Sequence, residues 1–106
     1  MTASLPRVIM LYRWRVHPGS DDQFVEAWSS ITQRLREERG SLGSRLHKGD
    51  DGLWYGYAQW PSADVMSNAF QQPVDELAAA RMRAAVVEHF TPVKLEPVAD
   101  FLVSSR

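Results

Sequence analysis

The sequence contains no cysteine among its 106 residues. Disulfide bonds, thiolate metal sites and a cysteine nucleophile are therefore excluded. No apolar run approaches the roughly 20 residues that a membrane-spanning helix needs. The residues before Pro6 contain no apolar core of the kind that a signal peptide carries, so we expect a cytoplasmic protein.

The chain also lacks an excess of charge of either sign. Lysine and arginine total 12, aspartate and glutamate total 13, and the formal net charge is −1. Nucleic-acid binding needs a concentrated basic face that releases counterions, so no nucleic-acid partner is expected. The three histidines, His17, His47 and His89, share no ligand spacing, which argues against a metal site.

The chain does have a core and many aromatic residues. Hydrophobic residues make up 44% of the sequence, which is ordinary for one domain of this length. We expect a single domain over residues 1–106, with its core between about residues 7 and 103. Four tryptophans, three tyrosines and four phenylalanines suit a core, an interface or a pocket for a flat ligand.

Local patterns predict a strand and a helix in the first part of the chain. Alternating apolar residues indicate a strand over residues 7–16. Ser20 precedes Gln23 by three residues, a capping-box pattern that begins a helix running to about Arg39. Gly40 supplies its left-handed end. The helix carries one apolar stripe, at Phe24, Trp28, Ile31 and Leu35.

The middle of the chain predicts a hairpin that is aromatic on both sides. Strands over residues 42–48 and 53–60 flank a glycine-containing turn at residues 49–52. Trp54 and Trp60 fall on one face of the second strand, and Tyr55 and Tyr57 fall on the other. A strand in a sheet with one face in water should carry apolar residues on the other face only, so this pattern indicates that both faces are covered. Because one chain of this length has too few elements to cover both faces, we expect a partner subunit.

The last part of the chain predicts two helices and a strand. Ser62 is placed to cap a short helix over residues 63–70. Pro73 suits the first position of a longer helix that ends near His89. The final strand is expected over residues 93–103, where Pro97 marks an edge strand or a bulge.

The predicted order, β-α-β-β-α-β, is that of a ferredoxin-like α+β fold. Right-handed crossovers give a four-stranded antiparallel sheet in the order 4-1-3-2, with the helices on one face. The helix-free face would expose an apolar patch of about several hundred Å², which is typical of an interface. Two such sheets packed face to face would form a homodimer, a dimeric α+β barrel.

This order of elements, with several short motifs, resembles the antibiotic biosynthesis monooxygenase family of dimeric α+β barrel proteins. The motifs are Val16-His17-Pro18-Gly19, Phe24 and Trp28, Gly40 and Gly43, and Trp60-Pro61-Ser62. The likeness covers roughly residues 7–100. Members include cofactor-free oxygenases of polycyclic phenols, haem-degrading enzymes and proteins of no known activity. The resemblance implies a small aromatic, polyketide-type or quinol substrate and no cofactor.

The family places a pocket-lining tryptophan at the end of the third strand, which implies a catalytic role for Trp60. A core tryptophan under the short helix is the alternative. Asn68 is the second candidate, either as an amide donor to the pocket or as a helix-end cap. His89 is the best candidate base because histidine is the side chain best suited to accept a proton in neutral solution, although a helix C-terminus also favours a cation there. The expected walls of the substrate site are Phe24, Trp28, Gly56, Ala58 and Phe70.

The haem-degrading branch resembles the chain less. Those enzymes carry a histidine ligand about ten residues after the tryptophan and an asparagine in the first strand, whereas this chain has Phe70 and no such asparagine. The resemblance therefore implies a cofactor-independent monooxygenase acting on a flat aromatic substrate. A non-catalytic ligand-binding or accessory protein with the same cleft is the main alternative, because no base is identified. A decarboxylase, isomerase or cyclase is the third.

Overall fold

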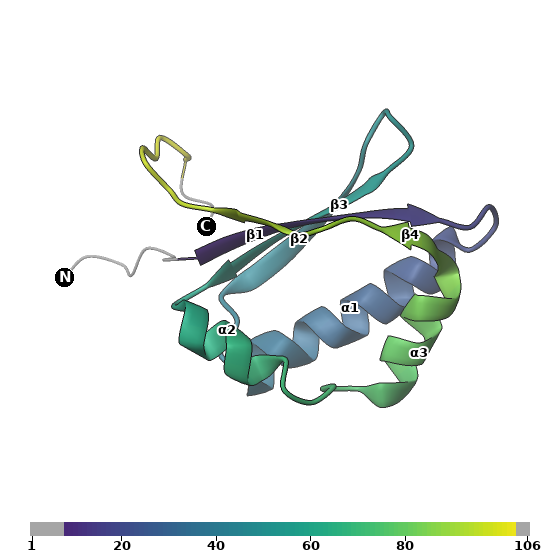
Figure 1. Cartoon of the computed structure of the whole chain (residues 1–106), viewed down its shortest axis with the longest axis horizontal. Helices are drawn as coiled ribbons and strands as arrows, with labels where there is room; N and C mark the ends of the chain where they lie inside the picture. The colour runs from purple at the N-terminus through teal and green to yellow at the C-terminus, as the bar shows by residue number, and fades with distance from the viewer. Residues whose placement is uncertain (1–7, 104–106) are drawn as a thin grey trace.

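A computed structural model describes residues 8–103. The elements are β1 (Val8–Val16), α1 (Asp21–Glu38), β2 (Gly43–Lys48), β3 (Trp54–Trp60), α2 (Ala63–Ala69), α3 (Glu76–Ala85), β4 (Val86–His89) and β5 (Val93–Leu95). The strands form one antiparallel sheet in the order β2-β3-β1-β4, and β5 also pairs with β1. The three helices lie on one side of the sheet (Figure 1). The predicted ferredoxin-like α+β fold is confirmed.

The strand register decides which side chains share a face of the sheet. On β1 and β3, Val8 lies opposite Trp60, and Tyr12 lies opposite Gly56. Residues directly opposed on antiparallel strands point to the same side. These two pairs, with Met10 and Ala58 between them, therefore lie on the face that the helices cover. Alternate residues lie on the helix-free face: Ile9, Leu11 and Arg13 on β1, and Tyr55, Tyr57 and Gln59 on β3.

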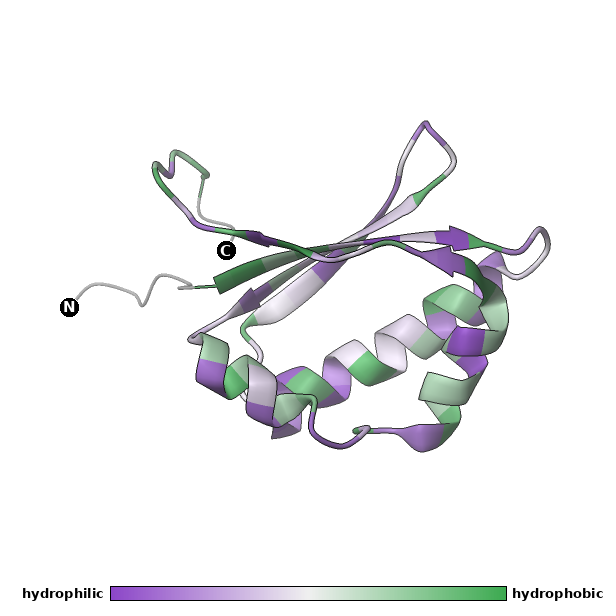
Figure 2. Ribbon diagram, viewed as in Figure 1, coloured by the Kyte–Doolittle hydropathy of each residue, from purple (hydrophilic) through white to green (hydrophobic). Residues whose placement is uncertain are grey.

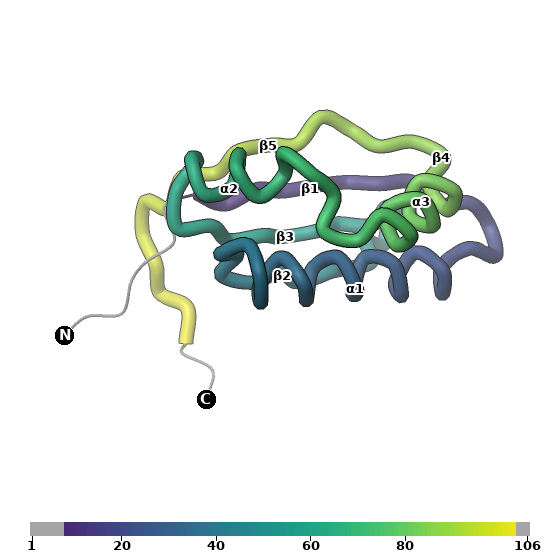
Figure 3. The backbone as a smooth tube through the Cα atoms, turned by 90° about the horizontal axis from the view of Figure 1, so that it is seen from below, coloured from purple at the N-terminus to yellow at the C-terminus, as the bar shows by residue number. Residues whose placement is uncertain are grey.

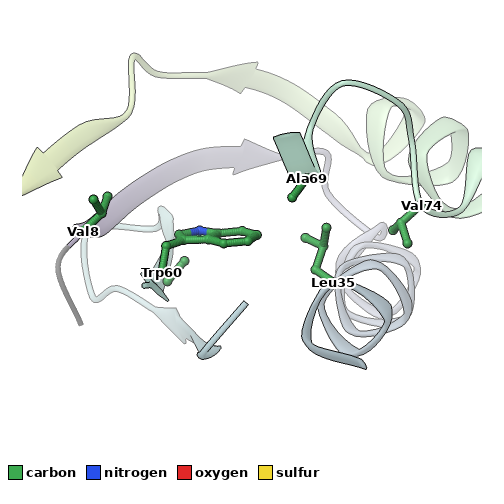
Figure 4. Close-up of a cluster of buried hydrophobic side chains, with 6 residues drawn as sticks. Val8, Leu35, Trp60, Ala69 and Val74 are labelled. Atoms are coloured by element: carbon green, nitrogen blue, oxygen red, sulfur yellow. The ribbon is translucent and has the colours of Figure 1, made fainter. Parts of the chain in front are cut away.

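The helices divide the covered face between them. Seen from the helix side, α1 runs along β2 and β3, while α2 and α3 lie at opposite ends of the β1 side (Figure 3). One core cluster joins sheet and helices, formed by Val8, Leu35, Ala58, Trp60, Ala69 and Val74. The Trp60 indole extends from its strand toward Leu35 and Ala69 (Figure 4). Figure 2 shows that β1, which begins with Val8 of this cluster, is hydrophobic at its start.

The predicted ends of α1 are half right. Gly40 has φ +84 and ends the helix as expected. The capping box at its start is wrong, because Ser20 is not extended and its side chain makes no cap bond. Gln23 instead donates its side-chain amide to the carbonyl of Arg81 (2.8 Å), which ties α1 to α3. The predicted start of β1 at Arg7, and the N-terminal residues before it, lie outside the described residues.

The predicted third helix is wrong at both ends. It begins at Glu76 rather than Pro73, because Asp75 caps it by accepting the backbone N–H of Ala78 (2.9 Å). It ends at Ala85, and the chain enters β4 at once. Val86 fits the apolar stripe of a helix, but two successive β-branched residues favour a strand that pairs with β1. His89 therefore lies in a strand and not at a helix C-terminus.

The predicted last strand is also too long. β5 covers only Val93–Leu95, and residues 96–103 form no helix or strand. β4 and β5 together take the place of the fourth strand beside β1, with residues 90–92 between them. Pro97 follows the strand, so it removes no ladder hydrogen bond. Beyond it, large apolar side chains are more than four-fifths exposed, at Val98, Phe101, Leu102 and Val103.

Candidate functional site

A cavity of about 470 Å³ lies between the covered face of the sheet and the three helices. Its volume falls in the range of about 300–1,000 Å³ that is usual for small-molecule sites. The strands supply its floor, α1 supplies one wall, and residues 69–75 with α3 supply the roof. Most of the lining is apolar, as in sites that bind an organic ligand.

Small residues on β3 create the space above the floor. Gly56 and Ala58 lie between the larger side chains of Trp54 and Trp60. A Cβ at residue 56 would come within 2.8 and 2.9 Å of two ring carbons of Trp14. Glycine at this position therefore lets the Trp14 indole lie across the strand.

Aromatic rings form the flat surfaces of the site. Tyr12 stacks on Trp14 with ring centroids 5.8 Å apart and an interplanar angle of 16°. Phe70, from the end of α2, meets Trp60 edge to face at 5.5 Å. Phe24 is fully buried behind Trp14, with centroids 5.3 Å apart. Flat rings held by such contacts suit a planar ligand, because aromatic pairs favour offset or edge-to-face arrangements.

Helix α1 and its C-cap residue Arg39 hold the roof in place through three hydrogen bonds. The Arg39 guanidinium donates to the carbonyls of Ala69 (2.7 Å) and Gln72 (3.0 Å). Farther along α1, the Ser30 hydroxyl donates to the Asp75 carboxylate (3.0 Å). The segment between α2 and α3 is thus fixed at both ends to the helix on the other side of the cavity.

Two titratable side chains of the described residues line the cavity, Tyr12 and Asp75. Burial raises the pKa of Tyr12, so its phenol stays neutral at ordinary pH. Hydrogen bonds from the Ala78 N–H and the Ser30 hydroxyl lower the pKa of Asp75, so its carboxylate stays ionised. Neither group has a pKa near neutrality, which an efficient general base needs.

Trp60 presents its ring to the cavity and buries its polar atom. The side chain is 1% exposed, and its indole nitrogen has no hydrogen-bond partner within residues 8–103. Buried donors without a partner are rare in native proteins. Among the described residues, one other buried side-chain atom lacks a hydrogen-bond partner. It is Nε of Arg13, which lies on the opposite face of the sheet.

The structure brings together five of the eight predicted site residues. They are Trp28, Gly56, Ala58, Trp60 and Phe70, all in the cavity lining. Phe24 lies behind the lining. Asn68 and His89 are exposed and lie outside it, with the Asn68 amide oxygen accepting a bond from Gln71 (3.5 Å). The catalytic roles of Trp60, Asn68 and His89 stay predictions.

The lining residues that sequence reasoning missed include Tyr12, Trp14 and Asp75. The alternation in β1 placed Tyr12 and Trp14 on one face, and pairing that strand with β3 would have placed them beside Gly56 and Trp54. Asp75, followed by a helical pattern, carried the signal of an N-cap.

Two further features concern residues 8–103, a metal centre and a membrane-spanning helix. No group of three histidine, aspartate or glutamate side chains in this range is placed to hold a metal ion. None of the described helices combines the length and the apolar character that crossing a bilayer requires.

Comparisons with known proteins extend these observations. The sequence profile of the antibiotic biosynthesis monooxygenase family matches residues 7–86. No curated protein matches the sequence. SnoaB, a cofactor-independent oxygenase from Streptomyces nogalater, has a similar structure: its TM-score is 0.76 at 17% identity, over 92% of this chain and 98% of SnoaB.

Two further solved structures are similar. PA3566 from Pseudomonas aeruginosa has a TM-score of 0.72 at 16% identity, over 92% of this chain and 100% of its own. Rv0793 from Mycobacterium tuberculosis has a TM-score of 0.73 at 14% identity, over 90% of this chain and 98% of its own. At such low identity these likenesses establish the fold alone.

Proposed function

The chain belongs to the antibiotic biosynthesis monooxygenase family, and from that premise we propose that it is a cofactor-independent monooxygenase of a flat aromatic substrate. A polyketide-type ring system or a quinol fits this description. The cavity carries the proposal, because its roughly 470 Å³ are lined mostly by apolar groups and by the rings of Tyr12, Trp14, Trp28 and Trp60. The similarity to SnoaB supports the same class of reaction.

The proposed reaction takes its electrons from the substrate. An ionised phenol or an anthrone-type carbanion passes two electrons to O₂ in single-electron steps, and a C–O bond forms. One proton completes the hydroperoxide, which then loses water and leaves a carbonyl group. A CH₂ group and O₂ thus become C=O and H₂O, so one oxygen atom enters the product and the other enters water.

The contribution of the protein is to hold the ring and to stabilise the anion. Donors placed in a dry site stabilise a developing oxyanion strongly, because little water competes with them. Trp60 is the first candidate for such a donor, and because its indole nitrogen is buried and unpartnered within residues 8–103, the ring would have to turn to present its N–H to the ligand. Because His89 lies outside the lining, we assign the loss of the substrate proton to the acidity of the substrate itself.

A second candidate function is ligand binding without turnover. It is favoured by a specific observation: the titratable residues that line the cavity within the described chain are Tyr12 and Asp75, and neither is poised as a base. The same cavity would then hold a planar ligand for another protein or for release.

Oxygen uptake with a panel of anthrones and naphthols separates the two functions. We expect uptake in proportion to protein, together with saturable quenching of tryptophan fluorescence. Quenching without uptake would establish the binding function and end the oxygenase proposal. The control pair is Ala58→Leu, which fills the floor, and Ala80→Leu, the same change on the exposed side of α3. Only the first should abolish quenching.

We also propose that the protein is a homodimer that packs the helix-free faces of two sheets together. Val93 and Leu95 on this face are 40% and 37% exposed in the single chain. Arg13 lies on the same face, 5.2 Å above the Phe90 ring, with its buried Nε unpartnered within residues 8–103. Exposed apolar side chains together with a buried donor that lacks a partner are typical of an interface.

A further inference from the structure

The cavity has a second polar end that the proposed reaction does not use. On the paired strands, Tyr12 lies opposite Gly56, whereas Val8 lies opposite Trp60. Four residues separate these positions along each strand, which corresponds to about 13 Å at roughly 3.3 Å per residue. A donor near Gly56 therefore serves a part of the ligand well away from Trp60.

Two donors reach this end from different elements. Tyr12 comes from β1 on the floor, and its hydroxyl makes no hydrogen bond to any residue within 8–103. Trp28 comes from α1 on the wall, and its indole nitrogen lies 3.7 Å from the place that a Cβ at residue 56 would occupy. This nitrogen also has no hydrogen-bond partner in the described range, so both groups are available to a ligand.

The charges around this end favour an acceptor on the ligand. The Tyr12 phenol is neutral because burial raises its pKa, and the Trp28 indole can only donate. The carboxylate in the lining, Asp75, already accepts bonds from the Ala78 N–H (2.9 Å) and the Ser30 hydroxyl (3.0 Å). Unpaired donors in a mostly apolar site bind an oxygen that water would otherwise hydrate.

We propose that the Tyr12 hydroxyl and the Trp28 indole N–H form a subsite for a carbonyl or phenolic oxygen at the end of the ligand remote from Trp60. The ligand is then a planar ring system with an oxygen at each end. This subsite presupposes that the cavity holds an aromatic ligand, as the proposed function states.

A purely structural role for Tyr12 makes a different prediction. Its ring stacks on Trp14, and that contact does not involve the hydroxyl. Tyr12→Phe keeps the stack and removes only the donor. Loss of the hydroxyl therefore affects oxygen-bearing ligands if the subsite exists, and affects no ligand selectively if the ring alone matters.

The test compares two ligands by titration calorimetry, naphthalene and a dihydroxynaphthalene with one hydroxyl on each ring. Removing one neutral hydrogen bond costs on the order of 1 kcal/mol, so we expect Tyr12→Phe to weaken the diol about five- to ten-fold. Naphthalene should bind as before. Trp28→Phe should show the same selectivity. The control is Tyr57→Phe, the identical change on the opposite face of the sheet, which should leave both affinities unchanged.

The possible outcomes distinguish this subsite from the proposed function. If both ligands bind and Tyr12→Phe weakens neither, or weakens both equally, the subsite is overturned while the cavity remains a ligand site. If neither ligand binds the wild-type protein, the subsite and the proposed function fail together. Selective loss of the diol with both variants establishes the subsite.

Discussion

The two faces of the sheet are built from the same strands but differ in what covers them. On the covered face, Gly56, Ala58 and Trp60 are buried by the chain itself, yet a cavity of about 470 Å³ remains above them. On the helix-free face, Leu11 and Tyr57 stay half-buried, and nothing within residues 8–103 forms a layer over them. One face borders a cavity, and the other is left uncovered by the helices.

This difference shows how alternation along a strand serves two kinds of recognition. The covered face has small residues in the middle and aromatic rings around them, a shape that suits a small planar molecule. The helix-free face combines apolar side chains such as Leu11 and Val93 with the Arg13 guanidinium, which suits a second protein surface. Changes confined to one face should therefore alter one kind of binding and spare the other.

The largest expected effect comes from a charge on the helix-free face. Leu11→Asp places a carboxylate between Tyr57 on β3 and Val93 on β5, in both copies of a dimer. An unpaired buried charge costs about 3 kcal/mol or more, so the dissociation constant of the dimer should rise more than 100-fold. Sedimentation velocity over a range of concentrations measures it.

Leu77→Asp is the matched control, because Leu77 lies on α3 and is 73% exposed. It should leave the dimer intact. A wild-type protein that stays monomeric at high concentration would contradict the proposed homodimer and the proposed role of the helix-free face as its interface.

The next effect concerns the covered face. In Gly56→Ala, the new Cβ would lie 2.8 Å from a ring carbon of Trp14, a ring that lines the cavity, so this ring must shift. Overpacking of this kind costs roughly 1–3 kcal/mol of unfolding free energy, and we expect ligand affinity to fall with it. Denaturant unfolding and fluorescence quenching measure the two quantities.

Gly52→Ala separates stability from binding. Gly52 has φ +85 and no atom within 4 Å of its Cβ position, so alanine there strains the backbone and leaves the cavity unchanged. Both variants should lose stability, but only Gly56→Ala should lose affinity. Equal affinity in the two would contradict the location of the ligand over Gly56.

The parts of the fold that local patterns specify could be predicted from the sequence. The stripe of α1, the glycine at its end and the Ser62 cap depend on neighbours within a few residues. The end of α3 could not be predicted in this way, because Val86 fits the period of a helix and that of a strand equally well. Pairing with β1 decided between them.

For the site, as for the fold, only part of the structure could be predicted from the sequence. Trp28 was found because it belongs to the apolar stripe of α1, and Trp60 because the family resemblance implies a pocket-lining tryptophan at the end of this strand. Tyr12 and Asp75 depend on strand register and on the course of the chain between α2 and α3, which no local pattern contains. The polar part of the cavity is therefore the part that sequence reasoning missed.

A smaller effect concerns the N-cap of α2, the helix that precedes the roof of the cavity. The Ser62 hydroxyl accepts the backbone N–H of Val65 (3.1 Å) and caps α2, which precedes the roof segment. Ser62→Ala should lower the unfolding free energy by about 1 kcal/mol, as loss of an N-cap usually does. The control is Ser20→Ala at the start of α1, where the side chain makes no cap bond. Similar losses for both serines would contradict a special role for the Ser62 cap.

The smallest effect is a pH dependence at the edge of the cavity. Bonds from the Ala78 N–H and the Ser30 hydroxyl lower the folded-state pKa of Asp75 below its ordinary value of 3.8. The ionised carboxylate therefore stabilises the fold fully above that value, and this contribution disappears as the pH falls through the folded-state pKa.

Asp75→Asn keeps a good N-cap but does not titrate. Its unfolding free energy should fall less steeply than that of the wild type below about pH 4, whereas the two curves should run parallel near neutrality. Parallel curves in acid as well would mean that the roof of the covered face does not depend on the charge of Asp75.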